Sequence, residues 1–207
     1  MSERILHQVT LSGHCHKVRL FLSLLGLSFT VKEIDMAAGE HQTSAFLALN
    51  PLAQVPVLID KGLVITDSNA ILIYLAQTYA SGSHWYPDNT LVQTQIQKYL
   101  SLAAGLLAEG AAAARLINVF KAPLDKAACL RKADRLLTYL NQVLSNQNWL
   151  AAEQISIADI AHYSYIAHAP EGDVDLTLYP AVQQWLQRIE TNSRFVAMPK
   201  TFVGLQK

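Results

Sequence analysis

Pro56 stands where a loop meets a short apolar run, Val57-Leu58-Ile59, and it restricts what this part of the chain can form. Proline has no backbone N–H, so within a sheet it is expected at the first residue of a strand or on an edge strand. A Val-Pro bond at such a bend is a candidate for the cis isomer, which is uncommon. A cis bend would leave the amide and the carbonyl of Val55 facing outward, where both can pair with an extended peptide.

Asp67 and Ser68 follow shortly after this strand, at the expected start of a helix. The first amides of a helix have no partner within it, and together with the helix dipole they attract a carboxylate. Two features are thus close in the sequence: a loop that can pair with a peptide backbone, and a helix start that can hold a carboxylate. Together they predict a pocket for a small peptide that carries a free carboxylate and a free amine.

The charge composition excludes some classes of partner. Lys plus Arg and Asp plus Glu number 16 each in the 207 residues, so the chain has no net field to attract nucleic acid or an anionic membrane. Charged residues make up 15%, below the ~25% usual for a soluble domain, and hydrophobic residues reach 51%. This apolar composition predicts a deep core or a surface that is covered in an oligomer.

Three features predict a cytoplasmic location. No apolar run is expected to approach the ~20 residues of a membrane span, and Arg19 interrupts the best candidate. Residues 1–4 lead straight into a strand-like run, so no signal peptide is expected. The two cysteines, Cys15 and Cys129, show no pairing pattern and suit a reducing compartment.

Strand and helix patterns alternate only in the first part of the chain. Strands are expected at residues 4–9, 28–34, 56–59 and 63–66, and helices at 14–26, 43–48 and 68–79. This alternation predicts a mixed sheet covered by helices. Residues 80–90 are rich in turn formers, and beyond them only helical patterns follow, at 91–119, 124–145, 156–167 and 180–190. We therefore expect an α/β domain at 1–80, a linker at 81–90 and an all-α domain at 91–207.

Five motifs, in this order and at these spacings, form a more specific pattern than any one of them alone: Gly39-Glu40-His41-Gln42, Phe46-Leu47-Ala48-Leu49-Asn50-Pro51, Gln54-Val55-Pro56, Asp67-Ser68-Asn69-Ala70-Ile71 and Ser156-Ile157-Ala158-Asp159. The pattern resembles the glutathione transferase family over nearly the whole chain. The run Leu11-Ser12-Gly13-His14-Cys15-His16-Lys17-Val18 is most similar to the bacterial serine-type members, related to the theta, phi and nu groups. The resemblance implies a thioredoxin-like N-terminal domain and an all-helical C-terminal domain that contributes the electrophile site.

The same resemblance implies that Ser12 activates the thiol of glutathione, which serves as co-substrate without a metal. Read without the family, Ser12 at the start of a helix is an N-cap. Cys15, in the first turn of that helix, is the rival, because a thiol there can have a lowered pKa. A reactive cysteine would indicate disulfide exchange, but a second cysteine within reach is missing and buried cysteines are common. His14 and His16 point apart on a helix and are expected to be solvated or capping residues rather than metal ligands.

Glutathione-binding residues are carried over from the resemblance at five positions: His41, Gln54, Val55, Asp67 and Ser68. Asp67 would meet the ammonium of the γ-glutamyl group, and the Ser68 hydroxyl and amide would meet its carboxylate. His41 and Gln54 would reach the glycyl end. The alternative for Asp67 and Ser68 is simple helix capping, and both roles are compatible.

Four further expectations concern other parts of the chain. Ala53 replaces a glycine that the family often carries, which suggests a turn that does not need a positive φ. Ser156 and Asp159 are close to a capping box. Arg115, Phe120 and Tyr163 are candidates to line an electrophile pocket, although aromatic residues at helical spacing are more often core. The expected helix at 91–119 contains Gly105 and Gly110, which would let it approach a second copy closely.

The sequence therefore predicts a cytoplasmic, homodimeric glutathione transferase that acts on a small hydrophobic electrophile. Two alternatives remain open: a glutathione-dependent disulfide oxidoreductase or peroxidase, and a non-catalytic interaction module with the same fold. For the assembly, the alternative is a monomer whose Ala-rich helix is buried within its own domain.

Overall fold

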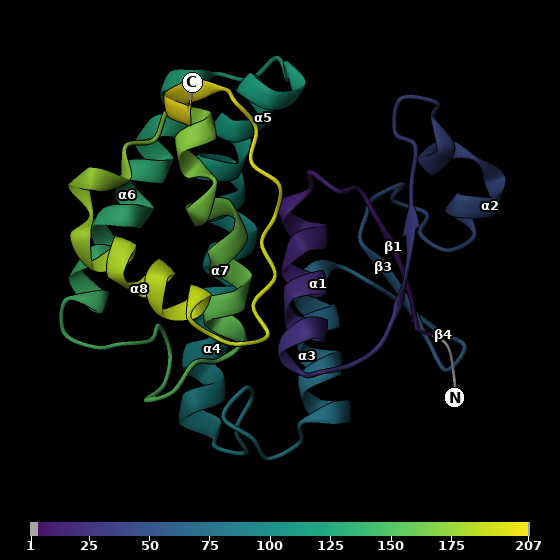
Figure 1. The fold of residues 1–207 in the computed structure, drawn as a ribbon, viewed down its shortest axis with the longest axis horizontal. Helices are drawn as coiled ribbons and strands as arrows, with labels where there is room; N and C mark the ends of the chain where they lie inside the picture. The colour runs from purple at the N-terminus through teal and green to yellow at the C-terminus, as the bar shows by residue number, and fades with distance from the viewer. Residues whose placement is uncertain (1–3, 207) are drawn as a thin grey trace. The chain divides into compact units, whose positions relative to one another are not determined.

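The computed structural model describes residues 4–206, and their contacts divide the chain into two compact units (Figure 1). The first unit extends to Ala80 and includes Arg194–Pro199 from near the other end of the chain, and the second contains Ser81–Ser193 and the residues from Lys200 onward. Residues 194–199 fall within the all-α domain expected from the sequence, whereas their contacts lie in the α/β unit. The Ser23 hydroxyl, for example, donates to the Arg194 carbonyl at 2.7 Å. Residues 1–3, on which the expected lack of a signal peptide depends, lie outside the described residues.

The first unit is built on a four-stranded mixed sheet in the order β2-β1-β3-β4, with β1 (Ile5–Gln8), β2 (Thr30–Glu33), β3 (Val57–Asp60) and β4 (Leu63–Thr66). β1 and β2 are parallel, and the helix α1 (Gly13–Leu24) makes the crossover that a parallel pair requires. β3 is antiparallel to both β1 and β4. The arrangement confirms the thioredoxin-like fold that the sequence predicts.

Helices on the two faces of the sheet complete this unit: α3 (Ser68–Tyr79), the 3₁₀ turn η1 (Glu40–Gln42) and α2 (Ser44–Leu47). α1 and α3 contact each other and lie side by side in Figure 1. On the side of α2, Phe46 packs in a buried cluster with Ile34 and Val57. β2 is the first strand in this order and therefore forms an edge of the sheet, and it is exposed along its whole length.

The second unit is helical among its described residues: α4 (Thr90–Leu102), η2 (Ala103–Ala112), α5 (Ala113–Phe120), α6 (Lys126–Leu144), α7 (Ile157–Ala167), η3 (Ala169–Gly172), η4 (Leu176–Leu178), α8 (Pro180–Glu190) and η5 (Gly204–Gln206). α4, η2 and α5 follow one another without a break, and η2 has the wider turn of a π-helix. The expected single α-helix at 91–119 is therefore interrupted in its middle. Apolar spacing alone does not reveal such a segment, which depends on packing.

Gly110 explains the close approach of η2 to α6. A Cβ atom at this position would come within 2.7 Å of the Ala133 nitrogen, so only glycine fits. The position of Gly105 is open, with nothing within 4 Å of a Cβ built there. The contact of Gly110 is with its own chain, and it therefore does not support the dimer for which the sequence analysis used it.

The helix Thr90–Phe120, with 31 residues, is long and apolar enough to cross a membrane by length and composition alone. The expectation that no apolar run approaches membrane length is wrong for this helix. Half of its most apolar stretch is buried, and η2 within it contacts both α6 and α7. This packing is that of a core helix in a helical unit.

The start of α7 confirms the predicted capping box. The Ser156 hydroxyl accepts from the Ala158 amide, and the Asp159 carboxylate accepts from the Ser156 amide at 2.9 Å. Asp159 also accepts from the Leu150 amide at 3.0 Å and from the Trp185 indole at 2.9 Å. Ser156 and Asp159 are fully buried. Through these hydrogen bonds, Asp159 connects the start of α7 to the segment at Leu150 and to α8 at Trp185.

Candidate functional site

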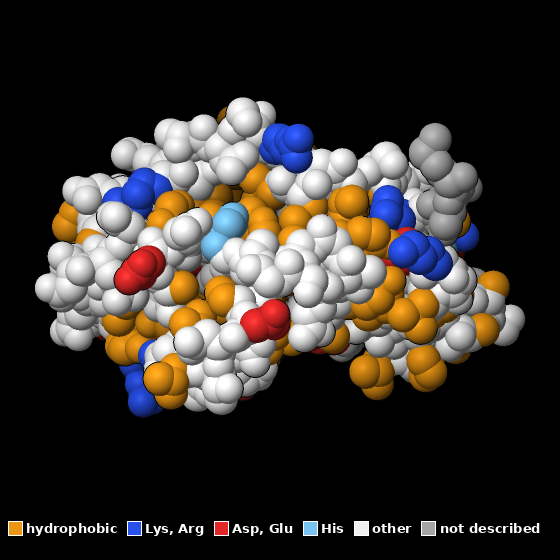
Figure 2. Space-filling model, turned by 90° about the horizontal axis from the view of Figure 1, so that it is seen from below, with side chains coloured by type: hydrophobic (Ala, Val, Ile, Leu, Met, Phe, Trp, Pro, Cys, Tyr) orange, Lys and Arg blue, Asp and Glu red, His pale blue; other side chains and the backbone are white. Residues whose placement is uncertain are grey.

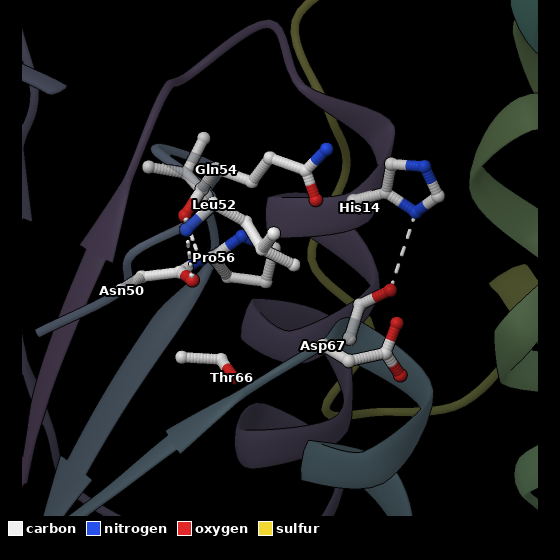
Figure 3. Close-up of a pocket in the computed structure, with 9 residues that line it drawn as sticks. His14, Asn50, Leu52, Gln54, Pro56, Thr66 and Asp67 are labelled. Atoms are coloured by element: carbon white, nitrogen blue, oxygen red, sulfur yellow. Dashed lines mark hydrogen bonds between the residues drawn. The ribbon is translucent and has the colours of Figure 1, made fainter. Parts of the chain in front are cut away.

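A cavity of about 150 Å³ opens beside the start of α3 in the first unit (Figure 3). It is lined by residues from α1, from the loop before β3 and from the junction of β4 with α3: His14, Asn50, Leu52, Gln54, Val55, Pro56, Thr66, Asp67 and Ser68. Four of the five predicted glutathione-binding residues line it. Asn50, Leu52 and Thr66 line the cavity in addition to the residues expected from the sequence.

The loop before β3 is held in shape by Asn50. Its side chain is buried, donates to the Gln54 carbonyl at 2.8 Å and accepts from the Leu52 amide at 3.1 Å. The turn is closed by the Ala53 amide, which donates to the Asn50 carbonyl at 2.9 Å. Ala53 has a φ of 55°, so the expectation that this turn avoids a positive φ is wrong. The turn needs a left-handed residue whether or not that residue is glycine.

Val55 presents its backbone to the cavity. The Val55–Pro56 peptide bond is cis, as the sequence predicts. Within residues 4–206, neither the amide nor the carbonyl of Val55 has a hydrogen-bond partner. Both groups are therefore available to an extended peptide in the cavity.

Asp67 caps α3 with one of its two carboxylate oxygens. Oδ1 accepts from the amides of Asn69 and Ala70, both at 2.9 Å. The residue is exposed and has a φ of 66°. Since Oδ2 takes no hydrogen bond from the described part of the chain, this oxygen can meet a cation in the cavity.

Ser68, the first residue of α3, is buried between two side chains of α1. Its hydroxyl oxygen lies 3.1 Å from the Lys17 ammonium and 3.2 Å from Nδ1 of His14, the contact drawn as a dashed line in Figure 3. The Lys17 ammonium also donates to Asn69 Oδ1 at 2.9 Å. A neutral hydroxyl thus stands between a buried cation and the cavity.

Burial lowers the pKa of both α1 side chains that contact Ser68, His14 and Lys17. Burial, aided by the charge of Lys17, lowers the pKa of His14 to about 3, so this imidazole is neutral. Burial lowers the pKa of Lys17 to about 8, against the opposing charge of Asp67. Lys17 is only 1% exposed, and the expectations from the sequence include no role for it. One signal was present: it lies four residues before Phe21, on the apolar face of the expected helix.

Ser12 is the N-cap of α1, as the simpler sequence interpretation expects. Its hydroxyl accepts from the Cys15 amide at 3.4 Å. It is half-buried and is not among the residues that line the cavity. The cap uses an acceptor site of the hydroxyl, and the hydroxyl also hydrogen-bonds the Cys15 side chain, which opposes the rise that burial causes in the pKa of that thiol.

Cys15 is placed as a core residue. Its side chain is 1% exposed, and burial raises the pKa of its thiol to about 11 although Ser12 and the Val9 amide oppose this shift. A thiol with this pKa is protonated near neutral pH, which argues against a redox nucleophile. His16 is also buried, and its Nε2 lies 2.8 Å from the Val196 carbonyl.

The other predicted site residues lie elsewhere. His41 is in η1, does not line the cavity, and its buried Nδ1 has no partner within the described chain. Arg115 is buried in the helical unit and pairs with Glu171 at 2.6 Å. Tyr163 is 4% exposed and donates to Glu190 at 2.8 Å, while Phe120 ends α5 and is 47% exposed. Burial and these partners place Arg115 and Tyr163 in the core of the helical unit rather than in an open pocket.

Two models of one protein family match this chain, one in each of its two units. The family model described as glutathione S-transferase, N-terminal domain, matches residues 6–77, and that of the C-terminal domain matches residues 111–192. Mouse glutathione S-transferase theta-1 is 28% identical over 190 residues, which cover 87% of this chain and 79% of that protein.

Solved structures are similar over nearly the whole chain. The crystal structure of a glutathione S-transferase from Pseudomonas fluorescens Pf-5 has a TM-score of 0.89 and 33% identity, and the match covers 94% of this chain and 98% of that one. A glutathione transferase homologue from Drosophila mojavensis, solved with bound glutathione, has the same fold, with a TM-score of 0.83 at 24% identity over 93% of this chain and 92% of that one.

Proposed function

Because the chain belongs to the glutathione transferase family, we propose that the cavity beside α3 holds the γ-glutamyl end of glutathione and that Ser12 activates its thiol. The observation that carries this proposal is the convergence in one cavity of the open backbone of Val55 with the polar groups of Asp67 and Ser68. A peptide with a zwitterionic head and an extended backbone matches all three. The thiolate then attacks a hydrophobic electrophile.

Each part of glutathione has a partner in this arrangement. Oδ2 of Asp67 meets the ammonium of the γ-glutamyl group, and the amide of Ser68 at the positive end of α3 meets its carboxylate. The amide and carbonyl of Val55 pair with the cysteinyl backbone. Gln54 in the cavity and His41 in η1 are assigned to the glycyl end.

Ser12 lowers the pKa of the bound thiol by donating a hydrogen bond to the sulfur. A free thiol has a pKa of ~8.5, and lowering it by two units requires ~2.7 kcal/mol. One hydrogen bond to a charged group contributes ~1.5–3 kcal/mol, and the dipole at the start of α1 adds ~0.3–1 kcal/mol. The two effects suffice without a general base. The sulfur then forms a bond to the electrophilic carbon, and the leaving group departs with the bonding electron pair.

Turnover assays test this function against its two alternatives. The proposed enzyme conjugates glutathione to a chloronitroarene faster than it reduces a hydroperoxide or a mixed disulfide. The reverse order would favour a peroxidase or disulfide oxidoreductase that uses the thiolate of glutathione. The high pKa of Cys15 argues only against disulfide exchange by this cysteine itself. Absence of glutathione binding in calorimetry would leave only a non-catalytic module with this fold.

We also propose that the protein is a cytoplasmic homodimer. Figure 2 shows a face with few charged side chains and with groups of hydrophobic ones between them. The exposed apolar side chains include Leu63 and Val64 on the edge strand β4. An exposed apolar edge strand is normally covered. Sedimentation equilibrium at micromolar concentration tests this assembly: a mass near twice 22.8 kDa supports the dimer, and a mass near 22.8 kDa contradicts it.

A further inference from the structure

The cavity beside α3 lacks a positive charge of its own. Of the side chains that line it, Asp67 is the formally charged one, and neither Lys nor Arg is among the lining residues that the structure describes. Glutathione carries two carboxylates and one ammonium near neutral pH, so it is a net anion. A cavity with an acidic side chain and no cation would repel glutathione, unless a residue buried next to the lining residues supplies a positive charge.

Lys17 is that charge. Its side chain is fully buried in α1, and its ammonium lies 3.1 Å from the Ser68 hydroxyl and 2.9 Å from Asn69 Oδ1, both in the first turn of α3. An ammonium has only donors, so the Ser68 oxygen accepts from it and the Ser68 proton points elsewhere. One direction is Nδ1 of His14 at 3.2 Å, and the other is the cavity that Ser68 lines.

We propose that Lys17 is a positioning residue that makes the site selective for the α-carboxylate of the γ-glutamyl group by acting through Ser68. The ammonium fixes the Ser68 oxygen as an acceptor and directs its proton toward the bound carboxylate. It also supplies the positive charge that the cavity lacks. This inference rests on the proposed function, because it names what recognises one end of glutathione.

The electrostatic reason is the burial of Lys17. A buried charge without a close counter-charge is unfavourable, and its present partners are a neutral hydroxyl and a neutral amide. The carboxylate of Asp67 is near enough to oppose the shift in its pKa but does not pair with it directly. A ligand carboxylate at Ser68 brings a second negative charge into this weakly screened region, where such an interaction is stronger than at the surface.

A pair of ligands isolates this interaction. S-methylglutathione, which has no titrating thiol, is compared by calorimetry with γ-aminobutyryl-S-methylcysteinylglycine, which lacks only the α-carboxylate. The wild-type protein is expected to bind S-methylglutathione about 10–100-fold more tightly, the range for a charge-assisted contact. In Lys17→Met this preference falls by at least about fivefold. Lys32→Met, which removes an exposed lysine of the same unit, leaves the preference unchanged.

The outcomes separate the inference from the function on which it rests. If the wild-type protein binds neither ligand, both the proposed function and the role of Lys17 are overturned. If it prefers S-methylglutathione and Lys17→Met keeps the full preference, only the role of Lys17 is overturned. If Lys17→Met lowers the affinity for both ligands by the same factor, the role of Lys17 is also overturned, because the loss of a purely structural residue would have that effect.

The wild-type protein alone provides a second measurement should Lys17→Met fail to fold. The ligands are then the glutaryl and butyryl forms of S-methylcysteinylglycine, which differ by the α-carboxylate and contain no amine. The titratable groups that face Lys17 are His14, neutral because its pKa is about 3, and the carboxyl group of Asp67, whose charge opposes the lowering of the Lys17 pKa. The preference for the glutaryl ligand is full below the Lys17 pKa of about 8 and declines as the pH rises above it. A preference that stays constant from pH 6.5 to pH 9.5 would overturn the proposal.

Discussion

Two helices of this chain begin with an acidic residue and a serine, and their surroundings differ. At α7, Ser156 and Asp159 are fully buried, and the Asp159 carboxylate accepts hydrogen bonds from Leu150, Ser156 and Trp185. At α3, Asp67 is exposed and uses one oxygen for capping. At α7 the carboxylate is fully used by partners within its own unit, whereas at α3 one carboxylate oxygen has no partner among the described residues and lies beside a cavity.

The difference shows how the same residue types acquire different roles. A buried cap whose acceptors are all occupied stabilises the fold and has nothing left for a ligand. At an exposed cap, a carboxylate oxygen without a partner can bind a cation, and the helix amides beside it can bind an anion. Substitutions at these positions should therefore separate effects on stability from effects on binding.

The largest effect is expected for Asp159→Ala. It leaves three buried N–H groups without their acceptor, at ~1–3 kcal/mol each, so with partial relaxation the free energy of unfolding should fall by about 3–5 kcal/mol. Chemical denaturation measures this loss. Glutathione affinity of the folded fraction should stay near the wild-type value. A selective loss of affinity at intact stability would mean that the buried start of α7 takes part in binding.

Ser12→Ala tests a third capped helix start. Turnover should fall about 10–100-fold, which corresponds to ~1.4–2.7 kcal/mol of lost thiolate stabilisation. The pKa of bound glutathione, followed by thiolate absorbance against pH, should rise toward that of the free thiol. Ser12→Thr, which keeps a hydroxyl, is the matched control. If the titration is unchanged and Cys15→Ala abolishes turnover instead, the cysteine holds the role.

Asp67→Ala should weaken binding more than chemistry. The KM for glutathione should rise about 5–30-fold, or ~1–2 kcal/mol, because the γ-glutamyl ammonium loses its partner, while kcat at saturation stays within about threefold. The free energy of unfolding should fall by only ~0.5–2 kcal/mol, the usual cost of a lost N-cap. Steady-state kinetics with parallel denaturation curves gives both values. A loss of stability as large as that of Asp159→Ala would contradict the distinction between the two helix starts.

Ala53→Gly is expected to have the smallest effect. Because Ala53 adopts a φ of 55° in the loop beside the cavity, glycine should relieve local strain and raise the free energy of unfolding by about 0.5–1 kcal/mol. Thermal denaturation would show a slightly raised Tm with unchanged glutathione affinity. A lowered Tm would mean that the added freedom of the unfolded chain outweighs this strain.

Features with a local chemical cause could be predicted from the sequence. The cis bond at Pro56, the capping box at Ser156 and Asp159, and the order of strands and helices all follow from residue type and spacing, and the structure confirms them. The positions of Gln54, Val55, Asp67 and Ser68 in one cavity follow from a loop and a helix start that belong to adjacent elements.

Features that depend on distant packing could not be predicted in this way. Lys17 reaches Ser68 only because α1 lies against α3. Arg115 is expected from the sequence in an open pocket, but it is buried and pairs with Glu171. Residues 194–199 carry no local sign that they return to the first unit. In each case the decisive contact joins residues that are far apart in the chain.

A crystal structure of the protein with S-methylglutathione would locate both ends of the ligand and its sulfur. We expect the γ-glutamyl ammonium at Asp67, its carboxylate at the amide and hydroxyl of Ser68, and the sulfur within hydrogen-bond reach of the Ser12 hydroxyl. The cysteinyl backbone should pair with Val55. A ligand bound at another surface, or a sulfur placed against Cys15 with Ser12 out of reach, would contradict the account.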